Sequence, residues 1–217
     1  MSFDRFVSNN KIQQMPSLII NEKRTIYFGK LLVIAGPSCS GKSQLIAKLQ
    51  SGKHENVFKE VNFNAKEPPA YLSLSSIRTL DQEYYPAVVL HLDILRLNNF
   101  HSYISEMLTN GRNDVVVITL CVRQKAIVYR LCKRTLWKLF DNIVNGRGRK
   151  SALEKFRVKW KFFKNVKALH QCYDTWFQLL EDRSIVENYV LDVNRDEIQK
   201  PRVYSKSLFQ SLIGFKV

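Results

Sequence analysis

Three continuous apolar runs dominate the hydrophobic pattern of the chain, and each has the length of a β-strand. They cover residues 31–35, 87–92 and 115–122. Continuous rather than alternating apolar runs are typical of strands buried on both faces, as in a parallel sheet. Because helix-length connections separate the runs, the pattern predicts βαβ units and an α/β fold with a mostly parallel sheet.

Weaker patterns fill the rest of the chain. Apolar residues at helical spacing predict helices over 42–50, 99–108 and 124–144, and over 151–182 with a break near residue 165. Shorter stretches predict strands at 71–75 and 187–193 and a small hairpin from 17–20 and 25–28. Residues 51–70 are polar and contain a Pro-Pro breaker, and residues 1–16 suit an arm or a short helix. We expect one domain over 1–217, with a helical subdomain over 123–182 inserted before the last strand region, 183–217.

Composition narrows the class of protein. Of the 217 residues, 45% are hydrophobic and 12% aromatic, which excludes an intrinsically disordered chain. No apolar run approaches the roughly 20 residues of a membrane span, and the N-terminus lacks the apolar region of a secretory signal. The four cysteines show no metal-ligand spacing. We therefore expect a cytoplasmic protein with reduced thiols.

The charge is strongly positive and unevenly distributed. Lys and Arg number 34 against 19 Asp and Glu, a formal net charge of +15. Residues 123–167 hold 15 of the basic residues and only Asp141 and Glu154 as acids, so this segment carries +13 and the rest of the chain +2. Such a surplus indicates an anionic partner, either nucleic acid, an anionic glycan or anionic lipid.

Aromatic residues interleave with these basic residues. Phe156, Trp160 and Phe163 fall at helical spacing, as do Trp137 and Phe140 on the preceding helix. We interpret these side chains as the core of the helical subdomain, and the basic residues as its face toward the anion.

One motif carries specific chemistry. Residues 36–43 read GPSCSGKS and fit G-x-x-x-x-G-K-[ST] at every fixed position, between an apolar strand and an amphipathic helix. In such a loop, backbone N–H groups surround a phosphate, Gly41 lets the backbone approach it, Lys42 reaches the β- and γ-phosphates, and the Ser43 hydroxyl binds Mg²⁺. The expected nucleotide-binding residues are Gly36, Ser38, Cys39, Ser40, Gly41, Lys42, Ser43 and Gln44.

In these residues the chain resembles the P-loop NTPase superfamily. The resemblance implies a three-layer α/β/α fold that binds ATP (or GTP) with Mg²⁺. The chain lacks the LSGGQ signature of ABC ATPases and the NKxD and DxxG motifs of GTPases. It is most similar to small kinases of nucleosides and nucleotides, which implies a phosphotransferase.

Two further features support this similarity. Arg130 and Arg134 lie i,i+4 on the helix after the third strand, where such kinases place a lid whose arginines stabilise the transferring phosphoryl group. Asp93 ends the second strand and is expected to hold Mg²⁺ through water or to act as general base toward the acceptor. Arg96 is a candidate acceptor ligand, and we interpret His91 as a hydrogen-bonded core histidine.

Other functions stay open at this point. The Asp-Arg or Glu-Arg pair of deoxynucleoside kinases is missing, and no residues match the acceptor sites of adenylate or guanylate kinases. The acceptor and the oligomeric state are therefore unassigned. The alternatives are a nucleic-acid-associated NTPase that uses the basic 123–167 segment, and a sulfotransferase-like protein whose loop binds the phosphate of a nucleotide sulfate donor.

Overall fold

The computed structural model of the chain describes residues 17–21, 24–53, 55–61, 63, 67–73, 84–97, 104–105, 107–108, 114–144, 149–182, 187–193 and 197–199. The N-terminal arm or short helix expected over 1–16 lies outside the described residues. Of the helix expected over 99–108, residues 104–105 and 107–108 are described, and they are helical.

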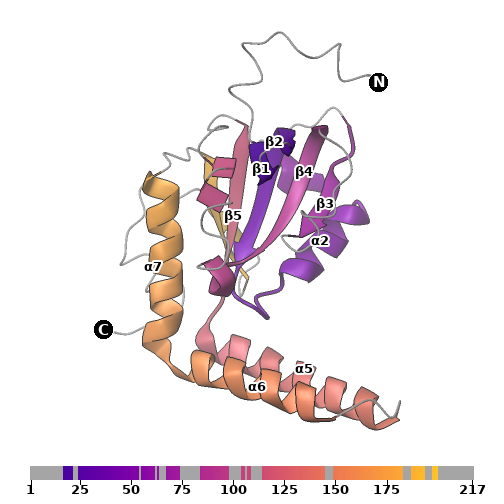
Figure 1. Cartoon of the computed structure of the whole chain (residues 1–217), viewed down its shortest axis with the longest axis vertical. Coiled ribbons are helices and arrows are strands. Elements are labelled where there is room, and N and C mark those ends of the chain that lie inside the picture. The colour runs from indigo at the N-terminus through magenta and orange to yellow at the C-terminus, as the bar shows by residue number, and fades with distance from the viewer. Residues whose placement is uncertain are drawn as a thin grey trace.

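A parallel sheet forms the centre of the molecule, which confirms the α/β class (Figure 1). Its five parallel strands are, in spatial order, β3 (Ala70–Ser73), β4 (Tyr84–Asp93), β2 (Arg24–Gly36), β5 (Val115–Cys121) and β6 (Glu187–Asp192). The predicted hairpin is confirmed, since β1 (Ser17–Asn21) pairs antiparallel with the start of β2. The second strand of the hairpin, predicted at 25–28, and the apolar run at 31–35 belong to one long strand, β2. A short strand that the pattern did not predict, β7 (Glu197–Gln199), pairs antiparallel with β6.

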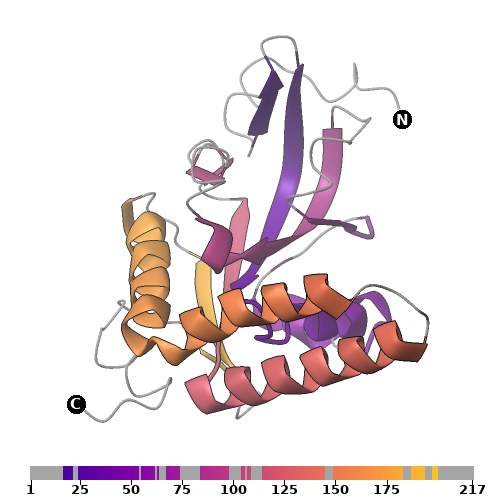
Figure 2. The ribbon, with the colours of Figure 1, turned by 60° about the horizontal axis from the view of Figure 1, so that its bottom comes forward.

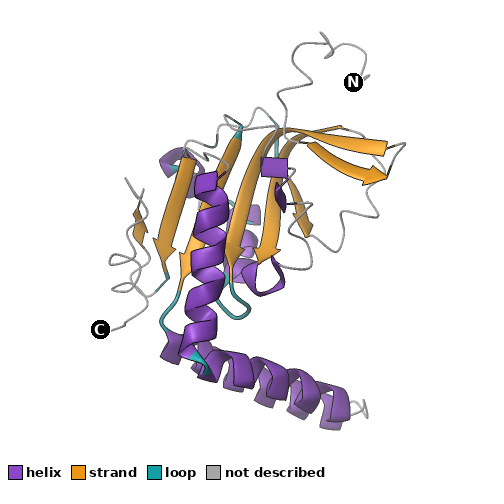
Figure 3. Cartoon of the chain, turned by 60° about the vertical axis from the view of Figure 1, so that its left-hand side comes forward, coloured by secondary structure: helices purple, strands orange, loops and turns teal. Residues whose placement is uncertain are grey.

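Both faces of the sheet are buried, which explains the continuous apolar runs. Along β2, Leu31 and Val33 belong to one core cluster, and Leu32 and Ile34 to the other. Helix α7 (Val166–Asp182) packs in the first cluster and covers that face of the sheet (Figure 3). Helices α2 (Lys42–Gln50) and α3 (Glu55–Glu60) pack in the second cluster.

Helix α3 was not predicted, because its sequence is mostly polar. Val57 in the helix and Val61, directly after its last residue, are 7% and 0% exposed. Phe63 follows at 3% exposure and packs in the same cluster. Phe58 packs against the same cluster. Four apolar positions in so short a segment are too few to give a detectable period.

Helices α5 (Gln124–Val144) and α6 (Arg149–Lys164) pair with each other and extend away from the sheet. We call this pair the arm; it lies across the end of the sheet toward which the parallel strands run (Figures 2 and 3). The bounds of α5 match the prediction, and the predicted break at 165 separates α6 from α7. Asn165 makes this break by accepting a hydrogen bond from the Ala168 amide through its side-chain oxygen, at 3.4 Å.

The interpretation of the aromatic residues as core is correct for some and wrong for others. Phe163 is fully buried, and Phe156 and Trp160 are half-buried. Trp137 and Phe140 are 66% and 64% exposed, because α6 packs on the other side of α5 and no described element covers this side. We call the exposed apolar residues of α5 the α5 stripe: Tyr129, Leu136, Trp137, Phe140 and Val144.

Among the described residues, none of the helices combines the length and the apolar character needed to cross a bilayer.

Candidate functional site

The 36–43 loop connects the central strand to α2. Strand β2 ends at Gly36, and α2 begins at Lys42. The register of the sheet pairs Gly36 with Asp93 at the end of the neighbouring strand β4. The loop and the acidic residue therefore meet at the carboxyl end of the parallel strands, where open α/β sheets bind ligands.

The loop is tightly folded, and both of its fixed glycines are required by geometry. Gly41 has a φ of 109°, a conformation that residues with a side chain rarely adopt. A Cβ atom at Gly36 would lie 2.9 Å from the Ser40 hydroxyl oxygen, closer than Cβ atoms approach in proteins, and 3.2 Å from Leu120, which is unusually tight. Cys39 has a φ of 66°, which costs a non-glycine residue about 1–2 kcal/mol.

The beginning of α2 offers unused hydrogen-bond donors. Within the described residues, the amides of Gly41, Lys42 and Ser43 donate no hydrogen bond. The helix has no side-chain N-cap and no acidic residue in its first turn. The N-terminus of α2 therefore carries a partial positive charge and free N–H donors next to the loop. Such a helix end suits an anion.

Lys42 lies inside the loop. Its side chain is 4% exposed, and its ammonium group donates hydrogen bonds to the carbonyl oxygens of Gly36 and Pro37, both at 2.7 Å. Burial lowers the pKa of Lys42 to about 8, although the nearby Asp93 carboxylate acts in the opposite direction. The loop thus holds a cation that is poorly solvated and close to the free amides.

Asp93 is connected to the loop and to the arm. Its carboxylate accepts a hydrogen bond from the Ser38 hydroxyl at 2.5 Å and another from the Leu95 amide at 3.2 Å. The Lys159 ammonium group, on α6, donates to the same Ser38 oxygen at 3.1 Å. Burial lowers the pKa of Lys159, and the nearby positive charge of Arg134 lowers it further. No sequence signal could have singled out Lys159, because it lies 121 residues from Ser38.

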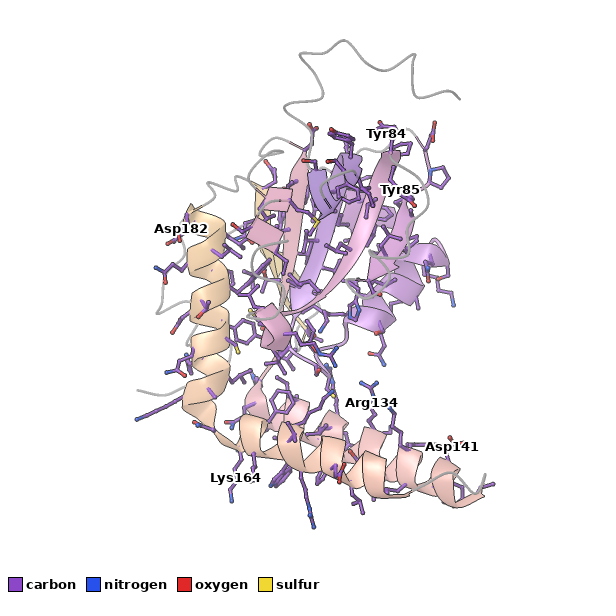
Figure 4. The ribbon with its side chains drawn as sticks, viewed as in Figure 1. Tyr84, Tyr85, Arg134, Asp141, Lys164 and Asp182 are labelled. Carbon is purple, nitrogen blue, oxygen red and sulfur yellow. The ribbon has the colours of Figure 1, made fainter. Side chains whose placement is uncertain are left out.

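The structure brings Arg130 to the loop and Arg134 close to it. One guanidinium nitrogen of Arg130 donates to the Ser40 carbonyl at 2.9 Å and lies 3.5 Å from the Cys39 carbonyl. Arg134 is exposed, one turn later on α5, and its charge lowers the pKa of Lys42. Figure 4 shows its side chain directed from α5 toward the end of the sheet that carries the loop.

The remaining candidate residues differ in exposure. Ser43 and Gln44 lie in the first turn of α2 and are exposed. His91 is half-buried, rather than enclosed in the core, and burial and the Lys42 charge lower its pKa. All four cysteine thiols are unpaired. In the described part of the chain, no group of three or more His, Cys, Asp or Glu residues could enclose a metal ion.

A cavity of about 400 Å³ lies beside Asp93, on the side of the loop toward α6. Its lining includes Arg96, which the sequence suggested as an acceptor ligand, and Lys159. The apolar side chains of Leu95 and Val158 form part of its wall, and Ser38 and Glu154 complete the lining. This volume is within the range of small-molecule sites.

Comparison with known proteins gives no match: no protein-family model, no curated protein and no solved structure is significantly similar to the chain. The function must therefore be argued from the site itself.

Proposed function

We propose that the chain binds a nucleoside triphosphate with Mg²⁺ at the 36–43 loop and transfers its γ-phosphoryl group to an acceptor, as a P-loop kinase does. The observation that carries this proposal is the combination at the start of α2: free amides, a glycine in a positive-φ conformation and a buried lysine within one loop. A triphosphate is the common ligand that presents several anionic oxygens to such a set of donors.

The residues of the site have separate roles in this proposal. The amides of the loop bind the phosphate oxygens, and Lys42 exchanges its two carbonyl partners for the β- and γ-phosphates. Arg130 and Arg134 supply positive charge from the arm to the transferring group, where a phosphoryl transition state gains most from it. In this proposal the Asp93 carboxylate, which lines the adjoining cavity, either accepts a proton from an acceptor hydroxyl there or holds Mg²⁺ through water.

The donor set suits Mg²⁺ better than a metal that needs a complete protein cage. Mg²⁺ keeps several waters and commonly takes one or two protein oxygens besides phosphate oxygens. The Ser43 hydroxyl and the Asp93 carboxylate are the oxygens that would hold it. When bound, the ion neutralises charge on the phosphate oxygens.

Replacement of Lys42 tests the nucleotide site. In Lys42→Ala, we expect ATP binding in the presence of Mg²⁺ to fall by at least about 100-fold, because the loop loses its hydrogen-bonded cation. Isothermal titration calorimetry measures the affinity, and thermal unfolding confirms that the variant is folded. Lys48→Ala is the matched control, since Lys48 is an exposed lysine near the other end of the same helix. Equal ATP affinity in Lys42→Ala and the wild type would refute the proposal.

Product analysis distinguishes the possible reactions. A kinase releases ADP in proportion to phosphorylated acceptor, whereas ADP formation without any acceptor indicates an NTP hydrolase. Displacement of bound ATP by a 3′-phosphoadenosine nucleotide at lower concentration than ATP itself would favour the sulfotransferase-like alternative.

A further inference from the structure

We propose that the arm binds a single-stranded nucleic acid in a groove along α5. The groove has a volume of about 360 Å³ and is lined by Arg134, Trp137, Lys138, Phe140, Asp141 and Val144. We call it the α5 groove. The proposal does not depend on nucleotide binding at the 36–43 loop.

Two exposed aromatic side chains line the α5 groove. Trp137 and Phe140 lie three residues apart on one helical face and are 66% and 64% exposed. Tyr129, on the same stripe, is 67% exposed, whereas Trp176 on α7 is fully buried. Exposed rings beside one another offer successive bases a surface on which to stack, whatever the base sequence.

Positive charges lie directly beside these rings. Arg134 and Lys138, one turn apart, line the same groove, and Asp141 is the carboxylate in its lining. The surrounding segment 123–167 carries a net charge of +13 in the sequence. Cations that follow the sugar–phosphate backbone, combined with rings that stack on the bases, are the usual means of binding single strands.

Two other occupants fit these observations less well. A second copy of the chain would bring two strongly basic arms together, and their repulsion opposes association. An anionic bilayer would suit the aliphatic Leu136 and Val144, but the groove does not face outward. Figure 4 shows Arg134 and Asp141, which both line the groove, along the edge of α5 on the side of the α/β body rather than on the outermost side of the arm.

The groove leads toward the nucleotide-binding loop. Arg134 lines the groove, and its positive charge lowers the pKa of Lys42. Arg130, one turn earlier on the same face of α5, is hydrogen-bonded to the Ser40 carbonyl. A strand in the groove would therefore run along α5 toward the 36–43 loop.

Fluorescence anisotropy of a labelled oligothymidylate of about 12 nucleotides tests the proposal at about 50 mM salt. We expect the wild-type chain to bind and Trp137→Ala to bind about 5- to 100-fold more weakly, because one stacking surface is lost. Trp137→Phe, which keeps a ring, should retain most of the affinity. Leu153→Ala is the matched control, because Leu153 is an exposed apolar residue of the arm outside the groove lining.

Salt dependence tests the charges separately. Lys138→Ala should reduce the slope of log affinity against log salt by about 0.7, the value for one phosphate contact on a single strand. Lys125→Ala removes an exposed lysine of the same helix outside the groove lining, and its slope should match the wild type.

Three results would overturn the proposal: no oligonucleotide binding at low salt, equal binding by Trp137→Ala and the wild type, or preferential binding to vesicles of phosphatidylserine and phosphatidylcholine. The Lys42→Ala variant separates the two proposals. It should lose ATP and keep the oligonucleotide, whereas Trp137→Ala should keep ATP and lose the oligonucleotide.

Discussion

Lys42 is the residue on which the proposed chemistry of the loop depends, and its pKa is unusually low. A lysine in water stays charged well above pH 9, whereas burial lowers the pKa of Lys42 to about 8. In the unfolded chain its pKa returns to the ordinary value, so the unfolded state holds more protons between these two pKa values. The contribution of Lys42 to the free energy of unfolding therefore rises with pH across that window.

Nucleotide binding should reverse this shift. Phosphate oxygens stabilise the charged ammonium group, so its pKa is higher in the complex than in the free protein. We expect ATP affinity to be constant below about pH 8 and to fall as the pH rises above it, by at most about tenfold per pH unit. Calorimetry over this pH range, in buffers of different ionisation enthalpy, measures the affinity and the proton uptake.

Lys42→Arg is the control for the pH dependence, because a guanidinium group stays charged throughout the range. Any affinity that Lys42→Arg retains should be independent of pH. A wild-type affinity that is the same at pH 7 and at pH 9.5 would contradict the assignment of the shift to Lys42.

For single residues, sequence reasoning finds candidate site residues that are close together along the chain. It misses site residues that only the fold brings together. Spacing alone identifies Gly36, Gly41 and Lys42, because the loop they form is local. The contact of Lys159 with Ser38 depends on how the arm folds back over the strand ends, and no spacing encodes it. The exposure of Trp137 could not be predicted either, because helical periodicity identifies an apolar face but does not show whether another element covers that face.

Among the elements, α7 contributes most clearly to the stability of the sheet. Trp176 donates from its ring nitrogen to the Thr119 hydroxyl at 2.9 Å, and the Tyr173 hydroxyl donates to the Leu120 carbonyl at the same distance. Both aromatic side chains are fully buried against the sheet. The helix is therefore fixed to β5 both by packing and by polar contacts.

Truncation of Trp176 should reveal this contribution. We expect Trp176→Ala to lower the free energy of unfolding by about 3–5 kcal/mol, because it leaves a cavity and an unpaired buried hydroxyl. Urea unfolding followed by circular dichroism measures the change. Gln178→Ala, at an exposed position of the same helix, should change stability by less than about 0.5 kcal/mol. Similar effects of the two substitutions would show that α7 is not anchored in this way.

The elements that were predicted well are those with strong, continuous patterns. The buried strands and the long helices α5 and α7 carry enough apolar residues to define their period. Helix α3 is six residues long with one buried valine, and β7 is three residues long, so neither provides a period, and tertiary contacts decide their conformation.

At the scale of the whole molecule, two side chains of the described part of the arm donate hydrogen bonds to the loop. Arg130 bonds the Ser40 carbonyl and Lys159 bonds the Ser38 hydroxyl, so one residue from each arm helix contacts the loop. A change in the loop can therefore be transmitted to the arm.

Removal of both contacts should loosen the arm without unfolding the sheet. In an Arg130→Ala/Lys159→Ala double variant, we expect amide hydrogen exchange in α6 to accelerate, while β2 and β5 exchange as in the wild type. Hydrogen exchange with mass spectrometry measures both regions in one experiment. Lys133→Ala/Lys161→Ala removes the same charge from exposed positions of the same two helices and should leave exchange unchanged. Indistinguishable exchange in the two double variants would mean that helix packing alone holds the arm.

The uneven charge has a consequence for how the molecule would meet a polyanionic partner. Residues 123–167 carry +13 of the +15 formal charge in the sequence, and most of this segment forms the arm at one end of the sheet (Figure 2). The chain is thus an electric dipole, and the field of an approaching polyanion exerts a torque that turns the arm toward it before contact. Productive first collisions then become frequent at low ionic strength, so capture is accelerated while the residence time, set by short-range contacts, changes little.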